Sequence, residues 1–118
     1  MQRILHAHDE LLSMRFRDAL PPRKGYTEKK MMGALCFMLN GNIIGGADRT
    51  KDGQGRFLFR ISKDNYEKAL KREGAQPMIM GGRTMSGFVF VDEKDCNAKA
   101  LSDWIHLALA FVETLPKK

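Results

Sequence analysis

An Asn-Gly pair between two apolar runs is the feature that most restricts how this chain can fold. Asn40-Gly41 follows an alternating apolar run at residues 31–39 and precedes a second run at residues 42–47. Both residues tolerate a positive φ, which the two-residue turn of a tight β-hairpin requires. The pattern therefore predicts two antiparallel strands joined by a type I′ turn.

The spacing of apolar residues divides the rest of the chain into helices and further strands. Helical spacing over residues 4–20 ends at Pro21-Pro22, and a second region of helical spacing covers residues 101–115. Ser62 and Asp64 offer capping oxygens, and a capping box at Asp64 and Glu67 predicts a short helix ending near Gly74. Strands are predicted at residues 56–61, 77–80 and 85–91, with polar connections at 21–27 and 48–55.

The order of these elements predicts the fold class. A helix, three strands, a helix, two strands and a helix contain no alternating crossover units, so a parallel sheet is not expected. We predict a two-layer α+β fold, α-β-β-β-α-β-β-α, with an antiparallel sheet and the helices on one face. The 118 residues suffice for one core, so residues 1–118 are expected to form a single domain.

Apolar residues within the predicted elements are expected to fill this core. Trp104 belongs to the apolar stripe of the last helix and should be buried. Most of the methionines fall in predicted strands and are expected to pack in the core, although they could instead line an adaptable apolar surface. Cys36 lies in an apolar run and should be packed, whereas Cys96 lies in a polar turn.

Composition indicates a soluble intracellular protein. No segment approaches the roughly 20 apolar residues of a membrane helix, and residues 1–10 lack the features of a signal peptide. We therefore expect a cytoplasmic location. A disulfide between the two cysteines is conceivable, but the reducing cytoplasm disfavours it.

An excess of positive charge favours acidic partners. The net charge is +6, and residues 15–30 contain six bases against only Asp18 and Glu28. This segment is a candidate face for nucleic acid or an acidic protein. The alternative is a solvated helix end and loop that only keep the protein soluble. The six bases are Arg15, Arg17, Arg23, Lys24, Lys29 and Lys30.

No group of residues has the spacing of a catalytic or metal site. His6 and His8 would point about 200° apart on a helix, and His6 with Glu10 supplies only two ligands. The carboxylates of residues 92–95 fit a polar turn ahead of a helix, where negative charge is favourable. No serine or cysteine has a histidine partner by spacing. We predict no enzyme activity, no cofactor and no metal.

Gly81-Gly82-Arg83-Thr84 is the candidate ligand loop. Successive glycine amides could converge on an anion, and the Arg83 guanidinium could bind phosphate or carboxylate. The alternative is a tight strand connection with Arg83 paired to an acid. Neither this loop nor Gly45-Gly46 has the spacing of a nucleotide-binding motif.

Several spaced motifs resemble the N-terminal domain of the TfoX/Sxy family. The segment Glu28-Lys29-Lys30-Met31-Met32-Gly33 is similar to the signature that opens the first strand of that domain. Residues 37–42, 82–91 and 104–116 are similar to later family positions in the same order. Met32, Ala34 and Phe88 stand where the family usually shows phenylalanine, glycine and tryptophan. These substitutions preserve the strand pattern.

The resemblance implies a fold of the secretion-chaperone type and a regulatory role. Founding members of the family are regulators of natural competence that act with the cyclic-AMP receptor protein at promoters, and they carry a further C-terminal domain. Because this chain ends just after its last predicted helix, we expect a stand-alone N-terminal domain.

The leading functional hypothesis is a non-enzymatic binding or regulatory module that contacts an acidic protein or nucleic acid. One alternative is a small-molecule or anion-binding domain, which could also be an enzyme of unknown reaction. Another is a dimeric, chaperone-like interaction module that uses an exposed face or edge of its sheet. The predicted binding residues are Lys29, Lys30, Arg60, Gly82 and Arg83.

Overall fold

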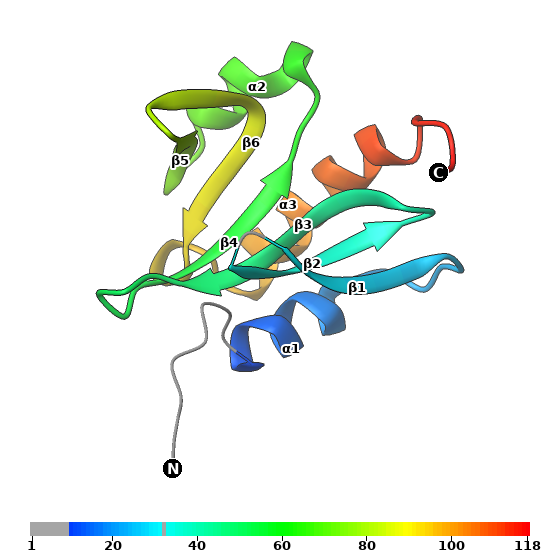
Figure 1. Cartoon of the computed structure of the whole chain (residues 1–118), viewed down its shortest axis with the longest axis horizontal. Coiled ribbons are helices and arrows are strands. Elements are labelled where there is room, and N and C mark those ends of the chain that lie inside the picture. The colour runs from blue at the N-terminus through cyan, green and yellow to red at the C-terminus, as the bar shows by residue number, and fades with distance from the viewer. Residues whose placement is uncertain (1–9, 32) are drawn as a thin grey trace.

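The computed structural model describes residues 10–31 and 33–118 (Figure 1). His6, His8 and Met32 lie outside the described residues, as does the beginning of the first predicted helix. The elements in chain order are α1 (Glu10–Ala19), β1 (Tyr26–Met31), β2 (Ala34–Leu39), β3 (Asn42–Arg49), β4 (Gly55–Arg60), α2 (Lys63–Leu70), β5 (Ala75–Met80), β6 (Arg83–Asp92), the short 3₁₀ helix η1 (Glu93–Asp95) and α3 (Ala98–Val112).

The strands form one antiparallel sheet in the order β1-β2-β3-β4-β6-β5. Every neighbouring pair in this order is antiparallel, so the predicted α+β class and the antiparallel sheet are confirmed. Asn40 and Gly41 have φ angles of 52° and 86° and connect β2 to β3, as the predicted hairpin requires. This turn sets the pairs Leu39–Asn42 and Met38–Ile43, after which the register shifts by one residue.

The sheet has one strand more than the sequence analysis predicted. β1 occupies residues that were expected to be partly connection and partly the start of the next strand. Gly33, at φ 77°, turns the chain between β1 and β2. Four of the six residues of β1 are exposed, so it shows no alternation of apolar and polar residues.

The second helix uses one of its two predicted capping residues. Ser62 is its N-cap, and the Ser62 side chain accepts a hydrogen bond from the Asn65 backbone amide at 3.2 Å. Asp64 therefore lies inside the first turn, where its charge favours the helix N-terminus, and the predicted capping box of Asp64 and Glu67 is wrong.

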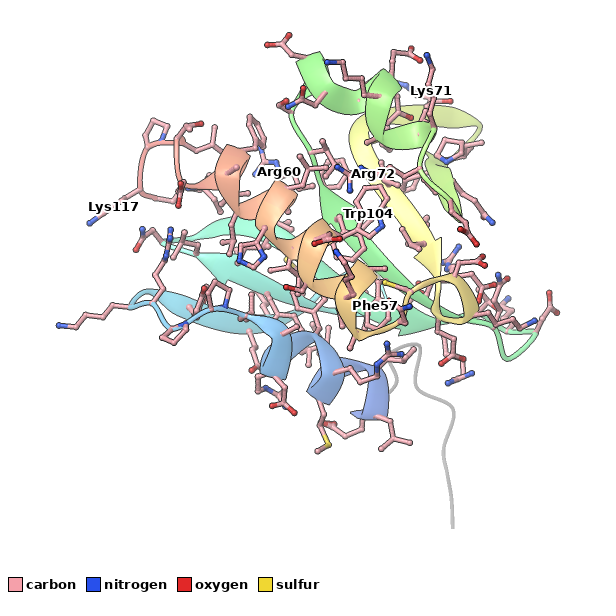
Figure 2. All side chains as sticks on the ribbon, turned by 180° about the vertical axis from the view of Figure 1, so that it is seen from behind. Phe57, Arg60, Lys71, Arg72, Trp104 and Lys117 are labelled. Carbon is pink, nitrogen blue, oxygen red and sulfur yellow. The ribbon has the colours of Figure 1, made fainter. Side chains whose placement is uncertain are left out.

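The helices cover one side of the sheet, which is seen from the helix side in Figure 2. In α1, the Phe16 ring stacks on Phe37 of β2 with 4.6 Å between centroids. In α3, the Trp104 ring stacks on Phe59 of β4 at 5.3 Å and is buried, as predicted. These contacts place the core between the two long helices and the central strands. Cys96 belongs to this core, although the sequence placed it in a polar turn.

Candidate binding surface

The five predicted binding residues do not form one site. Lys29 and Lys30 lie in β1 at one edge of the sheet. Gly82 lies in the turn between β5 and β6, and Arg83 begins β6, the strand next to the opposite edge strand. Lys29 is opposite Cys36 and Lys30 is opposite Leu35, so the two lysine side chains point to opposite faces of the sheet. Only Gly82 and Arg83 are brought together.

Arg60 is separated from both groups and is held by aromatic rings. It lies beyond the last β3–β4 pair, Gly45 and Phe59, and its half-buried side chain extends toward α3 (Figure 2). The guanidinium lies 5.6 Å from the Phe111 ring centroid and 6.0 Å from that of Phe88. Phe88 is five residues from Arg83 along β6, about 16 Å at strand spacing. Arg60 therefore links β4, β6 and α3 by cation–π contacts.

Two arginines of the basic segment are paired with acids. Arg17 donates two hydrogen bonds to Glu28, at 2.6 and 2.7 Å, and these bonds hold the pKa of the Glu28 carboxyl below its usual range. Arg23 forms an ion pair with Glu113, which lies at the C-terminal end of α3. The positive charge of these two side chains is offset at short range.

A third arginine of the segment is directed into the fold. Arg15 donates to the Cys96 carbonyl oxygen at 2.6 Å, and its guanidinium lies 5.1 Å from the Phe57 ring centroid. The three lysines, Lys24, Lys29 and Lys30, are exposed. The basic segment therefore presents fewer available cations than the sequence suggests.

The end of the β5–β6 hairpin carries three of the five exposed large apolar side chains in the described part of the chain, and the other two lie on α1. Residues 79–86, which we call the hairpin tip, are all exposed. Ile79, Met80 and Met85 keep 59%, 41% and 37% of their surface accessible. The expectation that methionines fill the core is thus wrong for Met80 and Met85, while Met78 is buried. Exposed large apolar side chains gathered on one element indicate an interaction surface.

The turn of the hairpin tip is built from glycine. Gly81 and Gly82 have φ angles of 57° and 78°, and no atom lies within 4 Å of where a Cβ would stand at either residue. Among residues 10–31 and 33–118, Arg83 forms no ion pair, so the acid partner expected of a plain strand connection is not found there. Met80 is directly opposite Arg83, and Ile79 is opposite Thr84. The tip therefore carries an apolar side chain on each face and one cation.

In the carboxylate-rich segment at residues 92–95, Asp92 serves local structure. Asp92 caps η1 by accepting a hydrogen bond from the Lys94 amide at 2.9 Å, and this bond lowers the pKa of Asp92.

No three His, Cys, Asp or Glu side chains within the described ranges are grouped so that they could hold a metal ion. Surface hollows of about 270, 370, 450 and 480 Å³ are lined by residues other than the five predicted binding residues.

Both cysteines are free and buried, and we expect them to resist alkylation in the folded protein. Burial raises the pKa of both thiols, that of Cys96 to about 11, so little thiolate forms near pH 8. Iodoacetamide at pH 8 should label neither cysteine in native protein and both in denaturant, as measured by intact mass. Rapid native labelling of either cysteine would contradict the buried placement.

These features define a class of protein: a small α+β domain with a six-stranded antiparallel sheet and an exposed apolar hairpin tip. The sequence profile of the TfoX N-terminal domain matches residues 18–112, and the chain belongs to that family. Searches of curated proteins and of solved structures gave no significant match. No described helix has the length and apolar content required to cross a bilayer.

Proposed function

We propose that this protein is a non-enzymatic accessory module of the TfoX type, which acts in competence or transcription regulation by binding a protein partner in the cytoplasm. Family membership supports the regulatory role. The observation that carries the binding role is the hairpin tip, where three large apolar side chains are exposed within eight consecutive residues. Apolar side chains near a cation are typical of the centre of a protein interface, in which aromatic residues, Met and Arg are enriched.

The distribution of charge favours a protein over nucleic acid as this partner. Arg17 and Arg23 are paired with acids, and Arg15 contacts the interior. Lys29 and Lys30 point to opposite faces, so the two side chains would not track the same phosphate backbone. Nucleic acid binding through this segment would depend on few cations, whereas the hairpin tip offers an apolar surface that nucleic acid backbones do not require.

A comparison of variants in the native host tests the proposal. Tagged wild-type protein and the double variant Met80→Ser, Met85→Ser should be isolated with their partners from the host, with and without nuclease. The matched control is Met14→Ser, because Met14 is 47% exposed on α1, away from the tip. We expect the amount of partner protein recovered with the tip variant to be at least tenfold lower than with the wild type. The control variant should recover as much partner as the wild type.

Two results would contradict this function. Equal recovery of partners by the wild type and the tip variant would show that the tip is not the contact surface. Loss of all partners after nuclease treatment would make nucleic acid the binding partner. Circular dichroism of each variant establishes that the fold is retained.

A further inference from the structure

The two edges of the sheet differ in a way that bears on what can bind to them. β1 and β5 are the edge strands, and each carries backbone groups that point away from the sheet. β1 contains Glu28, Lys29 and Lys30, and charged side chains on an edge strand oppose further pairing. β5, with the sequence Ala-Gln-Pro-Met-Ile-Met, contains no charged residue. The β5 edge therefore lacks the protection by charge that the β1 edge has.

Local irregularity limits where a strand can be added along β5. Pro77 has no backbone N–H and cannot donate to a neighbouring strand. The register with β6 shifts between Pro77 and Ile79, so the strand is not straight at this point. Regular pairing is left to the end of β5 at residues 78–80, which overlaps the hairpin tip. Because Met80 pairs with Arg83 across the two-residue turn, Ile79 is the residue there whose backbone N–H and C=O point outward. A short extended segment fits this edge better than a long strand.

The charge of the hairpin indicates the chemistry of the segment. Arg83 is the only charged residue between residues 74 and 91, and it has no ion-pair partner within the described residues. Because Met80 and Arg83 are opposite each other, they lie on one face of the hairpin, and Ile79 lies on the other. A strand that alternates acidic and apolar residues would place carboxylates on the Arg83 face and apolar side chains on the Ile79 face.

A second copy of this chain is a poorer occupant of the β5 edge. β5 carries no charged side chain, so a second β5 strand would leave Arg83 without an acidic partner. Pro77 would also lie at the centre of the interface, where it would supply no donor.

We propose that the β5 edge binds a short, extended, acidic segment of another protein, which is added to the sheet as a seventh strand along residues 78–80. This inference rests on the proposed function and specifies the partner and the mode of binding. Backbone hydrogen bonds hold the segment, a carboxylate pairs with Arg83, and apolar side chains pack on Ile79. The net charge of +6 assists the approach of an acidic segment.

Synthetic peptides in which acidic and apolar residues alternate test whether the bound segment must be acidic. The probe is a capped Val-Asp-Val-Glu-Val-Asp-Val peptide with a fluorescent label, with variants that carry Ile, Leu or Phe at the apolar positions. The control probe carries Lys at each acidic position. By fluorescence anisotropy, the acidic peptides should bind wild type, and Arg83→Glu should weaken binding at least tenfold. The matched control is Lys51→Glu, in the exposed β3–β4 turn, which should leave the affinity unchanged. Arg83→Glu should instead bind the basic peptide.

N-methylated peptides test the addition of a strand. Alternate backbone amides of an added strand point toward β5 and are lost to hydrogen bonding when they are methylated. Methylation of one alternate set of amides should abolish binding, and methylation of the other set should leave it. Equal effects of the two sets would overturn strand addition. If no acidic peptide binds while partner recovery still depends on Met80 and Met85, this inference fails and the proposed function stands.

Discussion

Replacement of Trp104 by alanine should destabilise the protein by about 3–5 kcal/mol, the range for removing a large aromatic side chain from a core. Trp104 is 2% exposed and its ring lies nearly parallel to that of Phe59, at 14° between planes. The Arg72 guanidinium lies 5.3 Å from the Trp104 ring centroid. The truncation would remove the stack between α3 and β4 and leave a cavity. Urea denaturation followed by circular dichroism measures the loss.

Two further variants make this result interpretable. Trp104→Phe keeps an aromatic ring against Phe59, so it should cost clearly less than Trp104→Ala and remain measurable if the alanine variant does not fold. Arg72→Ala removes only the cation–π contact and should cost about 0.5–1 kcal/mol. An unchanged urea midpoint for Trp104→Ala would contradict the core position of this residue.

The parts of the fold that the sequence predicts are those set by local signals. The Asn40-Gly41 turn needs only the conformational preferences of two residues, and the structure has both at positive φ. The stripe of α3 repeats over 15 residues, which is long enough to distinguish a helix from a strand. β1 has no such signal, because its stability comes from pairing with β2 and not from an apolar face.

The candidate site was harder to predict because charge along the sequence does not show where charge lies in space. Arg23 forms an ion pair with Glu113, which is 90 residues away in the sequence. No local sequence pattern predicts a contact between residues so far apart. The separation of Lys29 from Lys30 would follow from strand alternation, but only once β1 is recognised. The sequence did single out Gly82 and Arg83. It did not predict the exposure of Ile79, and it gave an exposed surface of methionines only as the alternative to core packing, because these residue types are usually buried.

Replacement of Gly45 by alanine should destabilise the protein by about 3 kcal/mol, the upper end of the usual cost of overpacking. A Cβ at Gly45 would lie 2.0 Å from the Leu58 carbonyl oxygen, and one at Gly46 would lie 2.4 Å from the Leu35 carbonyl oxygen. Both obstacles are backbone atoms of neighbouring strands, which cannot rotate away as side chains do. The glycine pair, which is not a nucleotide motif, is thus required where β2, β3 and β4 approach closely.

The matched control for Gly45→Ala is Gly82→Ala. Gly82 has φ 78°, but nothing lies within 4 Å of its Cβ position, so alanine there costs only the left-handed backbone, about 1–2 kcal/mol. Urea denaturation should therefore rank Gly45→Ala as the more destabilised variant, and amide hydrogen exchange should show its loss of protection concentrated in β3 and β4. If Gly45→Ala costs no more than Gly82→Ala, the close approach of Leu58 to Gly45 does not constrain the sheet, because β4 can move aside without loss of stability.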